Sequence, residues 1–319
     1  MHEFDLIKKY FSKLSIFNKN SLNLNDDVFF DKSKKLVISV DTYINKSHFF
    51  DFKKPNLVVK KILRSSISDL ICKGVKPKYY FISGSGNKKT FTKLNLSKIS
   101  FSLKQEQKKF GIYLSGGDTV FSNKLSFTIV SVGFSENIIF RNNAKINDDI
   151  YVSGNLGDSY VGLKILKKDI TLNKHLSEYF IMKYYLPELH IDLAKKLLNF
   201  ANTSIDISDG LFADLDKLIN KQKFSYKISL TDIPISKKLK DMILQKKLKK
   251  IDFISKGDDY QILFTASKKK ARIIERTFKS LGIKISKIGK ICSSNQKSQI
   301  IDEKGNKITI KSKGYLHKF

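Results

Sequence analysis

Three short runs of strand-forming residues in this chain each lead to an aspartate, and this arrangement constrains the fold more than any other feature. The runs and their acids are Lys35–Val40 with Asp41, Gly111–Leu114 with Asp118, and Thr203–Ile205 with Asp206. Because ligands of α/β sheets gather outside the carboxyl ends of strands, we expect these carboxylates to converge on one site. For any one of them taken alone, the alternative is an ordinary turn residue or helix N-cap.

The acidic residues as a whole favour the shorter side chain, since 23 of the 30 are aspartate. Ten of these aspartates fall in six clusters, most of them beside glycine, serine or threonine. Short carboxylates next to small residues suit hard cations such as Mg²⁺ that are held against phosphate oxygens. The clusters are Asn25-Asp26-Asp27, Ser39-Val40-Asp41-Thr42, Ser66-Ile67-Ser68-Asp69, Gly116-Gly117-Asp118-Thr119, Asp206-Ile207-Ser208-Asp209-Gly210 with Asp214, and Gly257-Asp258-Asp259-Tyr260. Together they predict an enzyme that handles phosphate.

Two features of the N-terminal half are typical of nucleotide contacts. Gly116 and Gly117 would let the backbone approach a phosphate closely, and Asp118 could then hold a metal ion against it. Arg141 is one of only four arginines beside 56 lysines, which indicates a need for bidentate bonding to phosphate. A plain surface arginine is the alternative.

The longest acidic cluster, which begins at Asp206, is typical of a turn between a strand and a helix. Asp206 and Asp209 flank this turn, where Ser208 and the amides of a helix N-terminus would bind phosphate. Asp214 lies further along the helix, where a surface ion pair is at least as good an explanation. His48, which follows the first of the acidic strands, could contact a substrate, although a lone histidine is more often a packed or exposed side chain.

The order of helices and strands predicts a two-domain α/β (α+β) fold for the 319 residues. We place the boundary at a turn-rich stretch, so that residues 1–145 and 146–319 form the two domains. Predicted helices span residues 3–17, 57–73, 91–110, 176–184, 189–200, 211–221, 236–247 and 267–280. Predicted strands span residues 35–40, 79–82, 111–114, 125–134, 150–153, 203–207, 225–230, 260–265, 283–291 and 298–302, and Ser83–Lys89 is expected to be a flexible loop.

Composition narrows the class of protein further. The net charge of +30 would fit a nucleic-acid-binding protein, but the lysines are spread along the whole chain instead of forming one basic stripe. No run reaches the ~18 apolar residues of a membrane helix. The N-terminus lacks the features of a signal peptide, so we expect a cytoplasmic protein. From the missing apolar run and the even spread of lysines we expect no membrane and no nucleic-acid partner. The two cysteines, Cys72 and Cys292, form no metal-binding pattern.

Taken in order, the motifs resemble the thiamine-monophosphate kinase family, whose fold superfamily includes aminoimidazole ribonucleotide synthetase. The resemblance runs from the N-terminal helix to the last residues. No single motif is decisive, but the ordered set is specific. Besides the clusters above, it includes His48-Phe49, Gly74 with Pro77, Arg141 with Ala144, Asp149-Ile150-Tyr151-Val152-Ser153-Gly154, and Gly314-Tyr315-Leu316-His317.

The resemblance implies ATP-dependent phosphorylation of thiamine monophosphate to thiamine diphosphate with several Mg²⁺ ions. It implies a homodimer in which the N-terminal domain binds ATP and metal and the C-terminal domain binds substrate and phosphate. The implied metal ligands are Asp27, Ser39, Val40, Asp41, Asp69, Asp118, Asp206 and Asp209. The implied ATP contacts are Gly117, Asp118, Arg141 and Ser208, and the implied substrate contacts are His48, Asp258 and Tyr315.

Phosphoryl transfer between two anions agrees with a site rich in carboxylates. Alignment and charge neutralisation matter more than covalent chemistry in such a reaction. Because the acceptor phosphate is already anionic at neutral pH, we expect no dedicated catalytic base. A carboxylate such as Asp258 and an aromatic ring such as Tyr315 are sensible partners for a cationic thiazolium.

Several positions depart from the family pattern. Asn25 replaces a usual glycine, Asn45-Lys46-Ser47 replaces an acidic-glycine loop, and Asp258 and Gln261 stand where Glu and an acid are common. Asn25 can adopt the positive φ of a glycine, the departures at residues 45–47 and at Asp258 concern substrate contacts, and the principal carboxylates stay in place. The alternatives are another enzyme of the superfamily, such as an aminoimidazole ribonucleotide synthetase, or a basic nucleic-acid-binding protein.

Overall fold

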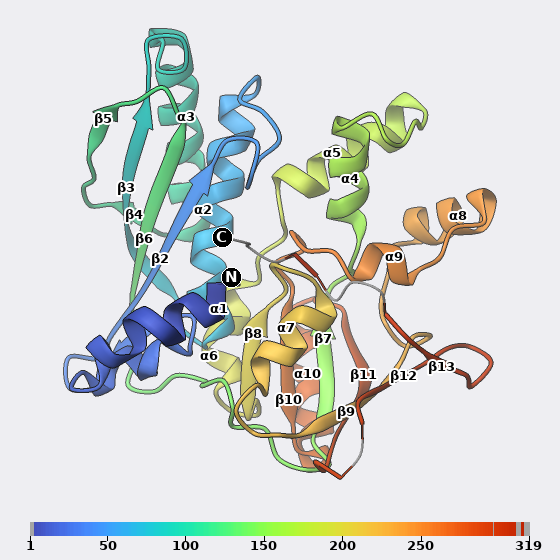
Figure 1. The fold of residues 1–319 in the computed structure, drawn as a ribbon. Helices are drawn as coiled ribbons and strands as arrows, with labels where there is room; N and C mark the ends of the chain where they lie inside the picture. The colour runs from blue at the N-terminus through green and yellow to red at the C-terminus, as the bar shows by residue number, and fades with distance from the viewer. Residues whose placement is uncertain (1–2, 296, 311–313, 316–319) are drawn as a thin grey trace.

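The computed structural model describes residues 3–295, 297–310 and 314–315, and these form two sheets with helices between and around them (Figure 1). The first sheet has the order β1-β2-β6-β3-β4, and β5 also pairs with β3. Its strands are β1 (Phe29–Asp31), β2 (Leu36–Ile44), β3 (Pro77–Gly86), β4 (Tyr113–Leu114), β5 (Thr119–Phe121) and β6 (Ser126–Phe134). Strands β1, β2, β6 and β3 pair antiparallel, whereas β4 and β5 run parallel to β3.

The second sheet has the order β13-β12-β9-β11-β7-β10-β8, in which β12 and β9 are parallel. Its strands are β7 (Asp149–Ser153), β8 (Thr203–Asp206), β9 (Ser225–Ser229), β10 (Ile262–Ala266), β11 (Ile285–Cys292), β12 (Gln299–Ile301) and β13 (Lys307–Ile308). The predicted α/β architecture with a mixed N-terminal sheet is therefore confirmed. The proposed domain boundary near residue 145 falls between Phe134 and Asp149, where one sheet ends and the other begins.

The helices lie on both sheets and between them. They are α1 (Glu3–Leu6), α2 (Pro55–Cys72), α3 (Lys93–Phe110), α4 (Asp158–Leu166), α5 (Lys174–Tyr185), α6 (Ala194–Leu197), α7 (Leu211–Leu218), α8 (Lys237–Lys246), α9 (Ile251–Ile254) and α10 (Ala271–Ser280). Shorter helical segments are Ile7–Phe11, Ser12–Ser15, Lys19–Leu24, Ile191–Leu193 and Lys268–Lys270. No helix in the described part of the chain is both long and apolar enough to cross a membrane.

Helix α2 joins the two halves of the molecule. It packs on β2 and β6 on one side and on β8, α5 and α6 on the other, as Figure 1 shows. Pro55 starts the helix with a suitable φ, and Gly74 at φ +83° follows its end. Except for the half-buried Leu57, its apolar residues are buried, and burial of each such side chain stabilises the fold by about 1.5–3 kcal/mol. Polar residues on α2 therefore lie between the sheets.

Strand β2 places a carboxylate on the inner face of the first sheet. Val37, Ser39 and Tyr43 are buried, whereas Val40 and Ile44 are exposed. By this alternation Asp41 shares the inner face, toward α2. Asp41 was predicted to follow the end of a strand, but β2 continues through it to Ile44 because the whole segment pairs with β6.

Strand β3 is longer than predicted. Ser83–Gly86 was expected to be part of a flexible loop, but it pairs with β6 on one side and β5 on the other. Two neighbouring strands supply hydrogen-bond partners, and these outweigh the weak strand preference of glycine and serine.

Candidate active site

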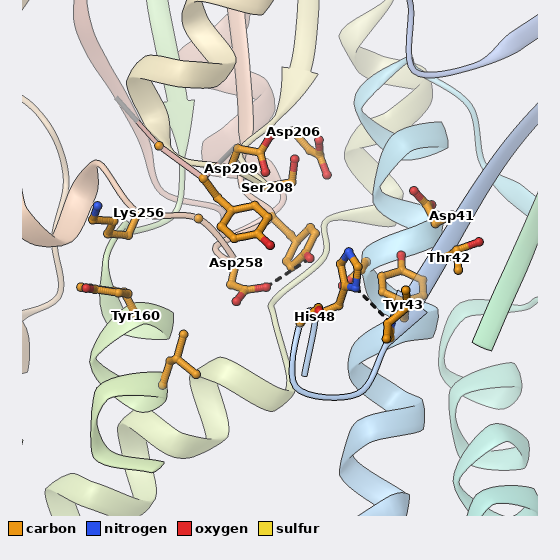
Figure 2. Close-up of a pocket in the computed structure, with 18 of the residues that line it drawn as sticks. Asp41, Thr42, Tyr43, His48, Tyr160, Asp206, Ser208, Asp209, Lys256 and Asp258 are labelled. Carbon is orange, nitrogen blue, oxygen red and sulfur yellow. Dashed lines mark hydrogen bonds between the residues drawn. The ribbon is translucent and has the colours of Figure 1, made fainter. Parts of the chain in front are cut away.

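A cavity of about 770 Å³ opens between the two halves of the molecule (Figure 2). Residues of β2 and the turn after it line one side, and residues of the C-terminal half line the other. The predicted site residues that line it are Val40, Asp41, His48, Asp69, Asp206, Ser208, Asp209, Asp258 and Tyr315. The cavity therefore brings together predicted metal, ATP and substrate residues from segments that are far apart in the sequence.

Three carboxylates from three different elements meet in this cavity. Asp41 comes from β2, Asp69 from α2 and Asp206 from the end of β8. Burial raises the pKa of Asp41 to about 6 and that of Asp206 to about 7. Burial, reinforced by the negative charges of Asp41 and Asp206, raises the pKa of Asp69 well above its usual value. The three groups therefore repel one another when all are ionised, which favours a cation among them.

Hydroxyl groups orient two of these carboxylates, and one oxygen of the third has no hydrogen-bond donor among the described residues. Ser39 Oγ donates to Asp69 Oδ2 at 2.5 Å, and Ser68 Oγ donates to Asp206 Oδ2. Among the residues that the structure describes, none donates a hydrogen bond to the buried Asp41 Oδ2. A buried carboxylate oxygen without a donor is costly unless a cation binds it, so this oxygen fits a metal ligand.

The donor set fits Mg²⁺ better than a metal enclosed by protein alone. Within the described ranges, no three His, Cys, Asp or Glu side chains are placed to hold one ion together. Mg²⁺ usually takes one or two carboxylates and completes its shell with water and substrate phosphates. Pairs drawn from Asp41, Asp69 and Asp206 meet that need.

The turn after β8 is held by Asp214. Its Oδ2 accepts the backbone N–H groups of Asp209 and Gly210, both at 3.0 Å, and its Oδ1 accepts from Lys217 Nζ at 2.9 Å. Lys217 also pairs with Asp209. Asp214 is fully buried and is therefore not the surface ion pair considered as its alternative. The sequence did not single out Lys217, which lies one helical turn after Asp214.

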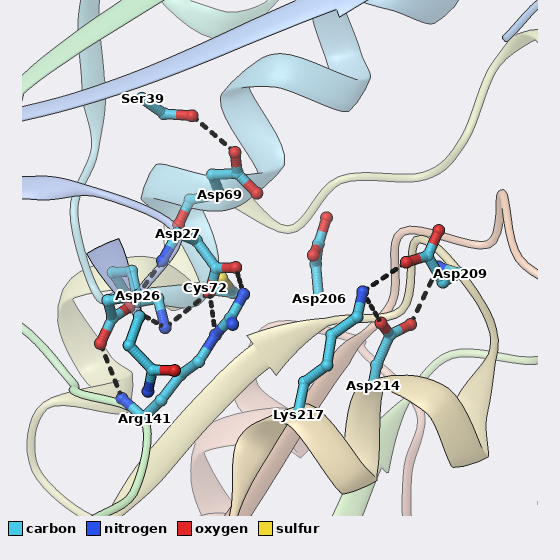
Figure 3. Close-up of polar contacts among 12 residues, drawn as sticks. Asp26, Asp27, Ser39, Asp69, Cys72, Arg141, Asp206, Asp209, Asp214 and Lys217 are labelled. Carbon is cyan, nitrogen blue, oxygen red and sulfur yellow. Dashed lines mark hydrogen bonds and ion pairs between the residues drawn. The ribbon is translucent and has the colours of Figure 1, made fainter. Parts of the chain in front are cut away.

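A second group of charges surrounds Asp27. Figure 3 shows Asp26, Asp27 and Arg141 beside one another, near Asp69. Arg141 Nε donates to Asp27 Oδ2 at 3.0 Å, and its Nη2 pairs with Oδ1, so the guanidinium makes a bidentate contact with the carboxylate. Lys73 Nζ lies 2.8 Å from Asp27 Oδ2. Asp27 and Arg141, predicted to bind metal and ATP separately, thus bind each other.

Asp118 lies apart from the other acids. It precedes β5, and its carbonyl accepts from Gly84 N at 2.8 Å. Strands β6 and β3 lie between it and Asp41, a separation of roughly 14 Å at the usual strand spacing. Its side chain is exposed and does not line the cavity as the described residues form it. Of the three carboxylates predicted to converge, Asp41 and Asp206 line the same cavity, whereas Asp118 of the same chain does not.

Gly117 has a structural reason to be glycine. Its φ is +152°, and a Cβ atom there would overlap the carbonyl oxygen of Ile82 in β3. The sequence predicted that the backbone at Gly117 would approach a phosphate closely. In the structure it approaches the backbone of the neighbouring strand β3 instead. Any larger residue would push the segment that carries Asp118 away from the sheet.

The residues predicted to touch substrate lie on both sides of the cavity, His48 in the turn after β2 and Asp258 and Tyr315 in the C-terminal half. His48 Nδ1 accepts the Ile44 backbone N–H at 3.0 Å, so a proton on the neutral ring sits on Nε2 (Figure 2). Tyr260 donates its hydroxyl to Asp258 Oδ1 at 3.3 Å. The backbone N–H of Tyr315 donates to the Asp209 carbonyl at 3.0 Å, which ties this segment to the turn after β8. Leu316 and His317 lie outside the described residues.

Lys61 is a residue of this site that sequence reasoning missed. Its Nζ lies 2.6 Å from Asp258 Oδ1 and 4.1 Å from the centroid of the Tyr184 ring. The side chain is only 2% exposed. A lysine at an inward position of the apolar helix α2 was the available signal, but the even spread of lysines along the chain concealed it.

Comparison with known proteins identifies similar chains over the whole length. Residues 25–135 match the family model of the AIR synthase related protein, N-terminal domain. The thiamine-monophosphate kinase of Buchnera aphidicola subsp. Schizaphis graminum is 35% identical over 99% of this chain and 98% of its own. That of Haemophilus influenzae is 32% identical over 99% of this chain and 98% of its own. The solved structure of AaThiL complexed with AMPPCP and TMP, 25% identical, superposes with a TM-score of 0.85 over 99% of this chain and 97% of that one.

Proposed function

The chain belongs to the thiamine-monophosphate kinase family, and we propose that it transfers the γ-phosphate of ATP to thiamine monophosphate, forming thiamine diphosphate. The observation that carries this proposal is the full-length similarity to kinases of that name. The solved relative that holds both AMPPCP and TMP adds support, because its fold covers nearly all of this chain.

Mg²⁺ is the cation that the acidic part of the cavity suits best. When bound, it would neutralise the phosphates of the two anionic substrates and hold them close together. Pairs drawn from Asp41, Asp69 and Asp206 would hold each ion, since these buried carboxylates share the cavity and their pKa values are raised mainly by burial. Ser39 would keep Asp69 oriented through its 2.5 Å hydrogen bond.

The remaining predicted ligands are proposals of the same kind. Asp209 and Ser208 lie at the turn that opens helix α7, where backbone amides favour a phosphate group. Val40 would offer its backbone oxygen to a metal ion. Asp118 would bind metal, and together with Gly117 it would contact ATP at the edge of the first sheet. Asp27 and Arg141 bind each other, so the metal and ATP roles that the resemblance implies for them remain predictions.

The chain's own residues would bind and orient the acceptor. Asp258 faces the cavity and is paired with Lys61 through Oδ1, so its Oδ2 is the oxygen that would meet a cationic thiazolium. His48 would present Nε2 as a hydrogen-bond donor, and the Tyr315 ring would pack on an aromatic ring of the substrate. A dedicated base is unnecessary, because the attacking phosphate oxygen is already anionic.

A homodimer is proposed from the outer face of the first sheet. Apolar side chains stand exposed on neighbouring strands of this face, namely Val40 and Ile44 on β2, Tyr79 and Phe81 on β3, Tyr113 on β4 and Phe134 on β6. In the described part of the chain no helix covers them. An apolar sheet face of this extent marks a protein interface, and a second copy would bury it against itself. Sedimentation of the purified chain would test this. A cytoplasmic location also stays a proposal, to be tested by cell fractionation.

The reaction is tested with the purified protein, Mg²⁺ and ATP. We expect thiamine diphosphate to form from thiamine monophosphate, and formylglycinamidine ribonucleotide to remain unchanged in a parallel sample. Turnover of the ribonucleotide alone would instead support the aminoimidazole ribonucleotide synthetase alternative. Tight, salt-sensitive nucleic-acid binding without stabilisation by Mg-ATP would support the nucleic-acid-binding alternative.

A further inference from the structure

The two groups of aspartates in this molecule differ in how their negative charge is balanced. Asp41, Asp69 and Asp206 share a cavity and have raised pKa values, mainly because they are buried. Asp26 and Asp27 lie on the other side of Asp69, where two cationic side chains contact them (Figure 3).

Lys73 is the centre of this second group. It follows the last residue of α2, and its side chain is 0% exposed. Its Nζ lies 2.7 Å from Asp26 Oδ1, 2.8 Å from Asp27 Oδ2 and 2.9 Å from the carbonyl oxygen of Ser204. An ammonium group has three protons to donate, so these three acceptors satisfy it completely.

Every oxygen of the two carboxylates has a donor as well. Asp26 Oδ1 accepts from Lys73 and from the Asp27 N–H at 2.9 Å, and Asp26 Oδ2 accepts from the Arg141 N–H at 2.9 Å. Asp27 Oδ2 accepts from Lys73 and from Arg141 Nε, and Asp27 Oδ1 pairs with Arg141 Nη2. Two negative charges therefore meet two positive charges, and no net charge is left to attract a metal ion.

Displacing either cation would be difficult. The side chains of Asp26, Asp27 and Arg141 are 5%, 10% and 9% exposed, so the group is nearly closed to solvent. Lys73 has no solvated position to move into, because its whole side chain is buried between α2 and β8. Removing one partner would leave an unpaired buried charge, which proteins tolerate poorly.

We propose that Lys73 is an internal cation that takes the place of a divalent metal ion at Asp27. No divalent ion then binds at Asp27, and Asp27 positions Arg141 and Lys73 instead of holding Mg²⁺. This inference rests on the proposed function for the identity of the metal. It departs from the family resemblance, which assigns Asp27 to the metal ligands.

The number of metal ions bound per chain tests the proposal directly. The full chain is stripped of metal with a chelator and titrated with Mn²⁺, and free Mn²⁺ is followed by electron paramagnetic resonance. We expect Asp27→Asn to bind as many ions as the unaltered chain. We expect Lys73→Met to bind one ion more, and the double variant with Asp27→Asn to lose that additional ion.

Two controls separate the possible outcomes. Lys76→Met removes an exposed lysine that pairs with Asp192 at 3.0 Å, and it should leave the ion count unchanged. Asp69→Asn should lower the count, and an unchanged count there would contradict the proposed metal site in the cavity. If Asp27→Asn alone binds one ion fewer than the unaltered chain, the proposal that Lys73 replaces a metal ion is contradicted, whatever ion count Asp69→Asn gives.

Thermal unfolding provides a second measurement if Lys73→Met is unstable without metal. Mn²⁺ should then raise the melting temperature of Lys73→Met by more than it raises that of the unaltered chain, because the ion replaces the missing ammonium. Equal shifts in the two proteins, or no additional ion in the variant, would show that Lys73 does not stand in for a metal.

Discussion

The ammonium group of Lys61 lies 2.6 Å from Asp258 Oδ1, so a buried cation on α2 orients a carboxylate that faces the cavity from the other half of the chain. Tyr184 flanks the lysine, with its ring centroid 4.1 Å from Nζ. The energetic gain of such a pair is small, because desolvation offsets much of the attraction. Its main effect is therefore to fix where Asp258 points.

Lys61→Met is expected to weaken the binding of thiamine monophosphate and leave ATP binding nearly unchanged. Without its cation, Asp258 loses its fixed orientation, and we expect the KM for thiamine monophosphate to rise about tenfold, or ~1.4 kcal/mol. Steady-state kinetics with each substrate varied in turn would measure this. Lys60→Met is the matched control, since Lys60 points toward Glu106 at 4.0 Å. Equal increases of both KM values would contradict a specific role.

The stability of the metal-free protein should fall as the pH rises from about 4 to about 7. The folded state raises the pKa of Asp41 from 3.8 to about 6 and that of Asp206 from 3.8 to about 7. In this window the folded protein binds more protons than the unfolded chain, so the free energy of unfolding decreases with rising pH. Each unit of pKa shift corresponds to about 1.4 kcal/mol.

Urea unfolding at a series of pH values, with chelator or with Mg²⁺, would measure this dependence. Mg²⁺ should flatten the curve, because the cation stabilises the ionised carboxylates. A slope that is the same with and without Mg²⁺ would argue against metal binding at these groups.

Asp69→Asn should stabilise the metal-free protein at neutral pH and abolish its activity. The substitution removes a buried charge that Asp41 and Asp206 repel, while the amide oxygen can still accept from Ser39. We expect a gain of about 1 kcal/mol in unfolding free energy, in the range of a single changed polar contact. Asp192→Asn, at an exposed acid, should change neither property. An active Asp69→Asn enzyme would contradict the metal role of Asp69.

Asp118→Asn should lose activity and remain folded. The side chain is exposed at the edge of the first sheet, so the amide leaves packing intact. Loss of a group that stabilises the charge of phosphoryl transfer typically lowers kcat by about 10²–10³. Turnover and circular dichroism of the variant would test both parts. Near-normal turnover would show that Asp118 takes no part in the reaction.

The sequence was sufficient to predict elements with strong local patterns. Helix α2 and strand β6 came within a few residues of their observed bounds because periodic apolar residues and a terminal glycine mark them. The turn at Asp206-Ile207-Ser208-Asp209-Gly210 was likewise predictable, since strand, glycine and helix follow in order. The convergence of Asp41 with Asp206 was expected in outline from the placement of these acids after strand-forming runs.

Pairings between distant residues could not be predicted in the same way. Lys73 and Asp27 are far apart in the sequence, and only the packing of α2 against the N-terminal loop brings them into contact. The same holds for Lys61 and Asp258. Strand pairing extended β2 through Asp41, because neighbouring strands supply hydrogen bonds that no local pattern records.

Asp41, Asp69 and Asp206 are proposed to hold divalent cations between two anionic substrates. A crystal structure of this chain with a non-hydrolysable ATP analogue, Mg²⁺ and thiamine monophosphate would test it most directly. We expect Mg²⁺ at about 2.1 Å from oxygens of these carboxylates and from phosphate oxygens of the analogue. Substrates bound outside the cavity, or Mg²⁺ without contact to any of the three aspartates, would contradict the account.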